Sequence, residues 1–94
     1  MQAISEEHLN KYRAITTEAL QAAKQAPIND QAGAEQIFDM VERYLQDAQY
    51  FREKDDWPRC LAAISYAHGW LDCGARLKTY TVTDNRLFTE DGED

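Results

Sequence analysis

The sequence predicts an all-α protein, an antiparallel three-helix bundle with a central third helix and a short C-terminal tail. Three observations lead to this fold class. Glycine and proline are scarce, at four and two of 94 residues, whereas alanine, glutamine, leucine and glutamate are plentiful. Apolar residues recur with the helical period in three segments. Each segment also begins at a residue type that caps helices. Ninety-four residues make one domain, 1–94, and leave no room for a second core.

The first helix is predicted over residues 5–26. Ser5 is a good N-cap, and Glu6 and Glu7 in the first turn interact favourably with the helix dipole. Pro27 ends the helix, because proline lacks the backbone N–H that the helix needs. The apolar positions form one stripe: Leu9, Tyr12, Thr16, Ala19, Leu20, Ala23 and Ala26. This helix therefore has one face that needs a partner.

The second helix is predicted over residues 31–54, with Asn29 or Asp30 as its cap. Its apolar positions cover an arc of roughly 140°, again a single face. They are Ala34, Ile37, Phe38, Val41, Tyr44, Leu45, Ala48 and Phe51. Asp55 or Asp56 caps a third helix over residues 57–78, and Pro58 falls in its first turn. Because the connection is short, these two helices should form an antiparallel hairpin.

The third helix carries two apolar stripes. The first consists of Trp57, Cys60, Leu61, Ile64, Ala67, Leu71 and Ala75. The second, on nearly the opposite side, consists of Ala63, Tyr66, Trp70, Cys73 and Leu77. Only a narrow polar arc remains, formed by Ser65, Asp72 and Arg76 with His68 at its edge. A helix that is apolar over most of its circumference is buried on more than one side, so we expect it to be central.

Two segments could pack over the second apolar stripe, and the sequence leaves both alternatives open. Residues 80–88 of the tail, which spans 79–94, can fold back over part of it, or a second copy of the chain can bind there. The acidic end "TEDGED" is predicted to be disordered. Ser65, Gly69 and Cys73 follow one another at intervals of four and form a ridge of small side chains. A mid-helix glycine costs about 1 kcal/mol relative to alanine, so we interpret the glycines as packing devices that let another backbone come close.

Charge and hydropathy exclude several classes of function. The net charge of −7 and the isoelectric point near 4.7 disfavour binding to nucleic acid or to anionic membrane surfaces. No apolar run approaches the roughly 20 residues that cross a bilayer, and the polar N-terminus is no signal peptide. Cys60 and Cys73 lie about 20 Å apart along one helix, too far for a disulfide. Two free, mostly buried thiols and a cytoplasmic location are expected.

Chemical motifs are weak. Ser65, His68 and Asp72 share one ridge, but a serine inside a regular helix has no oxyanion hole beside it. We instead expect His68 to be hydrogen-bonded to Asp72 four residues on, and Arg76 to pair with Asp72 one turn further along the helix surface. The histidines lack the Glu-x-x-His spacing of di-iron bundles, and the cysteines lack the spacing of a zinc site. No catalytic residue, cofactor or metal is predicted.

The residues from Tyr44 to Leu77 resemble the archaeal domain-of-unknown-function family 357. The resemblance rests on the run from Tyr44 to Ala48, the aromatic pair Tyr50 and Phe51, and "SYAHGWLDCGARL". The resemblance implies a helical bundle in an archaeal cytosol, and it implies no particular activity. The chain is also similar, more weakly, to the helical domains called HEPN, which often dimerise. Their nuclease form carries an arginine, four to six intervening residues and then a histidine, and here eight residues lie between Arg59 and His68, so the motif is absent.

Seven residues of the third helix are the candidate binding or interface residues: Tyr66, His68, Gly69, Trp70, Asp72, Cys73 and Arg76. We expect a non-enzymatic protein-interaction or scaffold module whose partner is a second copy, giving a homodimer, or another protein. The alternative is a nucleotide- or small-molecule-binding domain that uses Tyr66, His68, Trp70 and Arg76. A third hypothesis, an RNA-acting enzyme, requires an activity that depends on His68.

Overall fold

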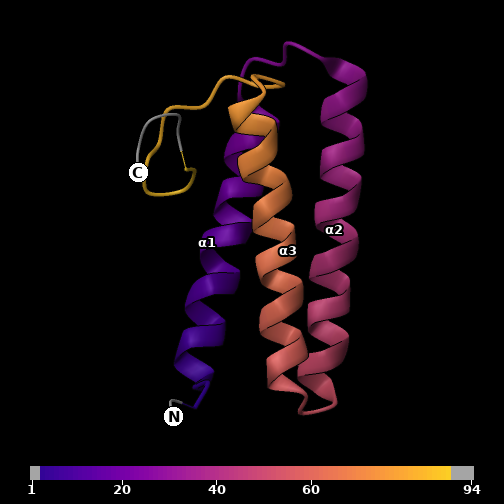
Figure 1. The fold of residues 1–94 in the computed structure, drawn as a ribbon, viewed down its shortest axis with the longest axis vertical. Coiled ribbons are helices and arrows are strands. Elements are labelled where there is room, and N and C mark those ends of the chain that lie inside the picture. The colour runs from indigo at the N-terminus through magenta and orange to yellow at the C-terminus, as the bar shows by residue number, and fades with distance from the viewer. Residues whose placement is uncertain (1–2, 90–94) are drawn as a thin grey trace.

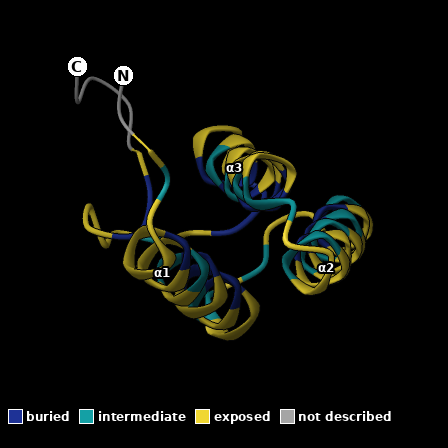
Figure 2. Cartoon of the chain, turned by 90° about the horizontal axis from the view of Figure 1, so that it is seen from below, coloured by how far each residue is buried: buried dark blue, intermediate teal, exposed yellow. Residues whose placement is uncertain are grey.

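The computed structural model describes residues 3–89. It consists of three helices, α1 (Glu6–Gln25), α2 (Gln31–Glu53) and α3 (Trp57–Arg76), followed by a tail (Figure 1). Figure 2 shows the three helices along their axes. The α3 helix packs against both other helices, whereas α1 and α2 make few contacts with each other. The described residues contain no strand beyond an isolated bridge between Ile28 and Tyr80. The prediction of a three-helix bundle with a central third helix is confirmed.

The helices begin where the predicted caps place them. The side chain of Ser5 accepts a hydrogen bond from the backbone N–H of His8 at 3.0 Å. Asp30 and Asp56 cap α2 and α3 in the same way, accepting from the backbone N–H groups three residues further on. These bonds satisfy amides that have no partner within the first turn of a helix.

The third helix ends at Arg76, two residues earlier than predicted. Lys78 adopts a φ of 60°, in the left-handed region that ends many helices. The N–H of Thr79 then donates to the carbonyl of Gly74 at 2.9 Å. The chain reverses at this point, so that the residues that follow return to the helices.

The tail completes the larger of two hydrophobic clusters. The helices contribute alanines together with Leu20, Ile37, Val41 and Leu71, and the tail adds two large aromatic residues and a leucine. Its buried members are Ala19, Leu20, Ala23, Ala34, Ile37, Val41, Ala67, Leu71, Ala75, Tyr80, Leu87 and Phe88. The smaller cluster, between the opposite ends of the helices, contains Leu9, Ala48, Cys60, Ala63 and Ile64.

Tyr80 anchors the first part of the tail. Its ring stacks on Phe38, with ring centroids 5.7 Å apart, and its hydroxyl donates to the carbonyl of Leu71 at 2.6 Å. Burial raises the pKa of the Tyr80 phenol well above its usual value of 10. A Cβ on Gly74 would overlap this ring. Gly74 is therefore a packing device, as predicted for the glycines of this helix.

The second part of the tail lies on the side of α1 and α3 that faces away from α2 (Figure 1). There it covers the predicted polar arc around His68 and Asp72, and it leaves the second apolar stripe open. Tyr66, Trp70 and Leu77 are 63%, 37% and 70% exposed. The expectation that the tail covers this stripe is wrong. Side chains of the polar arc offer hydrogen-bond partners to the tail's main chain, and an apolar stripe offers none.

The cysteines differ from the expectation of two mostly buried thiols. Cys60 is buried, whereas Cys73 lies exposed on the open stripe. The predicted disorder of the acidic end falls mainly on residues 90–94, which lie outside the described residues. Within residues 3–89, no helix is long and apolar enough to cross a membrane.

Candidate functional site

The seven candidate residues divide between two adjoining surfaces of α3. Successive residues of a helix are turned by about 100°, so residues two apart lie on nearly opposite sides. His68 and Asp72 face α1 and the tail, whereas Tyr66, Trp70 and Cys73 face outward. Gly69 borders both surfaces, and Arg76 is exposed near the end of the helix.

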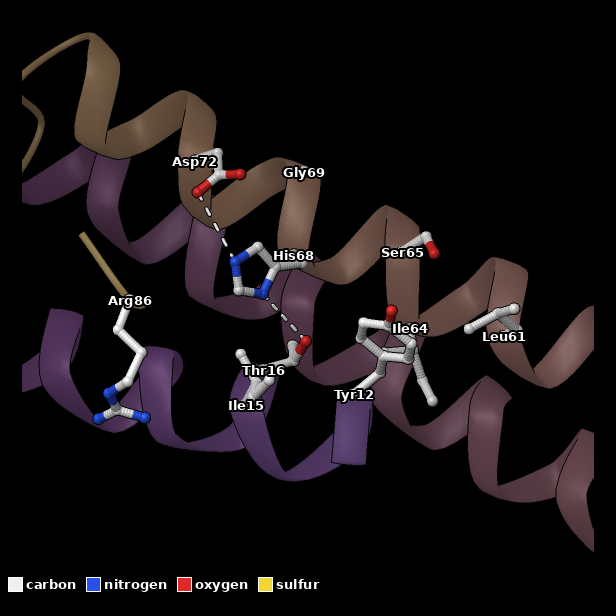
Figure 3. A pocket seen from close by; sticks show the side chains of 10 residues that line it. All are labelled: Tyr12, Ile15, Thr16, Leu61, Ile64, Ser65, His68, Gly69, Asp72 and Arg86. Carbon is white, nitrogen blue, oxygen red and sulfur yellow. Dashed lines mark hydrogen bonds and ion pairs between the residues drawn. The ribbon is translucent and has the colours of Figure 1, made fainter. Parts of the chain in front are cut away.

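The first surface is an open groove of about 640 Å³ between α1 and α3, here called the α1–α3 groove (Figure 3). Apolar side chains line one part of it and polar side chains the other. The apolar lining residues are Tyr12, Ile15, Leu61 and Ile64, and the others are Thr16, Ser65, His68, Gly69, Asp72 and Arg86.

His68 joins three elements at the polar end of this groove. Its Nε2 lies 2.7 Å from the carbonyl oxygen of Leu87, and its Nδ1 lies 3.0 Å from the hydroxyl of Thr16. A carbonyl can only accept, so Nε2 carries a proton and donates to Leu87. In the neutral ring, Nδ1 accepts from the buried hydroxyl of Thr16. His68 therefore connects α1, α3 and the tail through hydrogen bonds.

Further polar contacts fasten the same part of the tail. Asp72 accepts a hydrogen bond from the backbone N–H of Thr89 at 3.0 Å, and its Oδ1 lies 3.7 Å from Nε2 of His68. The guanidinium of Arg86 donates to both carboxylate oxygens of Glu18, at 2.6 and 3.2 Å. This pairing lowers the pKa of Glu18 and raises the pKa of Arg86. The described contacts of His68 and Asp72 are those of side chains that hold a tail in place.

The second surface, here called the outward face of α3, consists of Ser65, Tyr66, Gly69, Trp70 and Cys73. These residues surround a shallow hollow of about 320 Å³. Tyr66 stacks on Tyr44 of α2, with ring centroids 5.4 Å apart. Residues 60–71 of the chain contain no Asp, Glu, Lys or Arg, although 29% of the whole chain is charged. The outward face is therefore an uncharged, partly aromatic surface on an acidic protein.

Gly69 is the unusual member of this face. A Cβ built there would meet no atom within 4 Å, and its φ lies outside the left-handed region that favours glycine. Neither a close contact within the described chain nor the local backbone requires glycine at this position. The contrast with Gly74, whose missing Cβ makes room for Tyr80, is direct.

Sequence reasoning missed several residues of the α1–α3 groove. Thr16 was placed in an apolar stripe, and Arg86 belongs to a segment without periodicity. A threonine within an apolar stripe was the available signal, because a buried hydroxyl needs a partner. Among the described residues, no three His, Cys, Asp or Glu side chains form a group that could hold a metal ion.

These features define a class of protein: a small three-helix bundle, closed by its own tail, with an uncharged outward face on the central helix. The family is shown by comparison with known sequences. The chain belongs to the family described as "Protein of unknown function (DUF357)", which matches residues 11–80 and confirms the predicted membership. No curated protein and no solved structure matches the chain.

Proposed function

We propose that this protein is a non-enzymatic interaction module that self-associates through the outward face of α3. The single observation that carries the proposal is the empty space at Gly69. A mid-helix glycine costs about 1 kcal/mol relative to alanine, and no contact of the described chain offsets that cost. A second backbone lying against the ridge would offset it, because glycine lets two helices approach closely and gain dispersion contacts.

The chemistry of the face favours a protein over a nucleotide. Tyr66 and Trp70 are enriched residue types at protein interfaces, where they supply large, rigid contact areas. A nucleotide site that used Tyr66, His68, Trp70 and Arg76 would need these side chains to converge. His68 instead faces Thr16 and the tail, while Tyr66 and Trp70 line the hollow on the outward face.

A second copy of the chain fits this face better than an unrelated protein. The ridge of Ser65, Gly69 and Cys73 is narrow and small, so it is complementary to a copy of itself. The net charge of −7 opposes self-association in general, but the outward face adds no like charges where two copies would meet. A standard interface covers about 800 Å² on each partner, roughly one-eighth of the 6196 Å² surface. We expect a dimer of micromolar affinity, since α3 supplies only part of that area.

The exposed thiol of Cys73 supports a reducing location for this module, because free surface thiols are oxidised elsewhere. The cytoplasm of an archaeon, the setting that the family resemblance implies, would supply it.

The experiment is sedimentation equilibrium of the full chain from about 1 to 500 μM, comparing the native protein with Trp70→Glu. Burying a glutamate at an interface is costly, so Trp70→Glu should remain monomeric where the native chain dimerises. Tyr50→Glu is the matched control, because Tyr50 is an aromatic residue of α2 that is 56% exposed and lies outside the face. A native chain that stays monomeric at 500 μM would overturn the proposal.

A further inference from the structure

We propose that the α1–α3 groove is a docking site for an extended segment of another protein. Residues 83–89 of the tail, here called the strap, occupy one end of this site within the same chain. The partner segment resembles the strap at that end, with a basic residue followed by two large apolar residues, as in Arg86, Leu87 and Phe88. The groove is a different surface from the outward face of α3, so this proposal does not depend on self-association.

The tail is held in two different ways. Its first part is joined to the loop between α1 and α2 by main-chain hydrogen bonds, since the carbonyl of Thr79 accepts from the N–H groups of Asn29 and Asp30 at 2.8 and 3.2 Å. Within residues 3–89, no hydrogen bond between main-chain groups joins the strap to another part of the chain. Side chains of α1 and α3 and apolar contacts hold it instead. The strap is therefore held in the way that a bound peptide is held.

His68 and Asp72 bind main-chain groups of the strap. Nε2 of His68 donates to the carbonyl of Leu87 at 2.7 Å, and Asp72 accepts from the N–H of Thr89 at 3.0 Å. Main-chain carbonyl and N–H groups occur in every peptide, so this pair can hold a segment of another protein in the same way. Selectivity comes from the side chains that accompany these groups, since Leu87 and Phe88 are buried.

Glu18 adds selectivity for charge. Both oxygens of its carboxylate accept hydrogen bonds from the guanidinium of Arg86, the two-bond pairing that arginine makes with carboxylates. The whole chain has a net charge of −7, which also attracts a basic segment and repels an acidic one. The expected partner segment is therefore basic as well as apolar.

The open part of the groove continues directly from the strap. His68 and Asp72, which bind the strap, also line the groove, and Arg86 of the strap lines it with them. Figure 3 shows Arg86 and Asp72 at one end of the groove and Leu61 at the other. Apolar side chains line this far end and remain accessible, Tyr12 being 46% exposed. A longer segment bound along the groove would cover them.

The strap fills only one end of the groove because of where it enters. It follows Tyr80, which lies near the C-terminal end of α3, and it reverses in a turn closed by hydrogen bonds to the carbonyl of Asp84. Beyond this turn it runs in the direction of α3, from the height of His68 to that of Asp72. The residues before the turn are needed to bring the chain down from Tyr80, so they do not extend into the open part.

A segment of another protein is not tied to α3 and can remain extended along the whole groove. Three extended residues before the one bound by His68 span about 10 Å. Seven residues of α3 span about the same length, because each adds about 1.5 Å, and Leu61 precedes His68 by seven. Such a segment therefore reaches the apolar end of the groove that the strap leaves open.

Fluorescence anisotropy with the full chain tests the proposal. The probe is a fluorescein-labelled synthetic peptide of residues 82–89, whose sequence includes the strap. Phe88→Ala removes a buried ring from the strap, so the strap occupies the groove less and competes less with the added peptide. We expect Phe88→Ala to bind the peptide at least tenfold more tightly than the native chain does. Arg86→Ala loses an exposed ion pair and keeps the buried residues, so it should bind the peptide about twofold to fivefold more tightly.

A second peptide tests the open part of the groove. It carries Thr83→Leu and Asn85→Leu, because in an extended chain these side chains lie on the same side as Leu87. The two leucines should bury apolar surface at the far end of the groove. We expect this peptide to bind the Phe88→Ala chain at least tenfold more tightly than the first peptide does.

Two substitutions added to Phe88→Ala locate the bound peptide. Tyr12→Glu, in the open part of the groove, should cancel the gain from the two leucines. Trp70→Glu, on the outward face, should leave the binding of both peptides unchanged. Loss of binding in Trp70→Glu would place the peptides on the outward face and overturn the proposal.

The remaining outcomes are equally decisive. Circular dichroism establishes which variants keep the native helical content, and Arg86→Ala decides the matter if Phe88→Ala does not fold. Folded variants that bind the first peptide no more tightly than the native chain would show that the strap does not occupy a docking site. A second peptide that binds no more tightly than the first would overturn the extension of the site along the open groove.

Discussion

The two glycines of α3 should respond to alanine in opposite directions. At Gly69 a Cβ would enter open space, and the backbone is in an ordinary helical conformation. The replacement Gly69→Ala should therefore recover most of the helix-propensity difference, about 0.5–1 kcal/mol. For a chain of this size, each 1 kcal/mol raises Tm by roughly 4–8 °C. The isolated chain should become more stable.

The replacement Gly74→Ala should destabilise the chain despite the same gain in propensity. Its Cβ would overlap the ring of Tyr80, which is fully buried. Moving that ring disturbs the stacking on Phe38 and the hydrogen bond to the carbonyl of Leu71. Overpacking of this kind costs about 1–3 kcal/mol, and the lost hydrogen bond adds about 1 kcal/mol. The sum exceeds the propensity gain, so we expect a net loss of about 1–3 kcal/mol.

Urea denaturation at two protein concentrations measures both effects. At about 1 μM, where the chain should be monomeric, Gly69→Ala should raise the free energy of unfolding and Gly74→Ala should lower it. At about 200 μM the native chain should gain stability by the proposed self-association. Gly69→Ala should gain much less, because its Cβ would hold the second backbone away. If Gly69→Ala lowered stability at 1 μM, something within the chain would touch Gly69 and the reasoning would fail. If it dimerised as tightly as the native chain, the ridge would not be the interface.

Three further predictions concern the tail and the thiols. The replacement His68→Ala should lower the free energy of unfolding by about 1–3 kcal/mol in urea denaturation, because two hydrogen bonds are lost; an unchanged midpoint would show that His68 does not hold the tail. Tyr80 should ionise only when the chain unfolds: its folded-state pKa is raised above the unfolded value of about 10, so its contribution to stability is complete below pH 10 and is lost as the pH rises further. Absorbance titration checks this, and Tyr80→Phe should weaken the alkaline loss. A thiol reagent should modify Cys73 at once and Cys60 only on unfolding, since burial raises the pKa of the Cys60 thiol and blocks access of the reagent. Equal modification rates of the two thiols would contradict the structure. If the chain dimerises through the outward face, Cys73 should be modified more slowly at high protein concentration.

The local features of the fold could be predicted because their causes are local. Ser5, Asp30 and Asp56 cap helices through hydrogen bonds to amides three residues away, and a sequence displays such spacings directly. The apolar period of each helix is also a local property. The central position of α3 was predicted from its two apolar stripes, but the second stripe is open, and α3 meets α1 and the tail partly through His68 of the polar arc. These arguments need no knowledge of how distant segments meet.

The position of the tail could not be predicted because its contacts are distant in sequence. Thr16 lies 52 residues from His68, and Leu87 lies 19 residues from it. A polar arc on a helix usually faces water, and nothing in the sequence distinguishes one that binds the main chain of another segment. The candidate residues were assigned to a single site on one helix, whereas the structure divides them between the α1–α3 groove and the outward face.

The way the tail closes the bundle bears on what the outward face is for. Leu87 and Phe88 are buried without help from Tyr66, Trp70 or Leu77, so folding of the single chain does not depend on covering that stripe. Burial of apolar surface stabilises a protein by about 25 cal/mol for each Å², and a folded monomer with exposed apolar side chains does not gain this free energy. A polar side chain at position 77 or 66 would reduce the exposed apolar surface without disturbing the buried core. The proposed self-association would remove Tyr66, Trp70 and Leu77 from water in a step after folding. Gly69 fits the same order of events, since its cost in helix propensity falls on the monomer and the contact proposed to offset that cost lies outside the monomer.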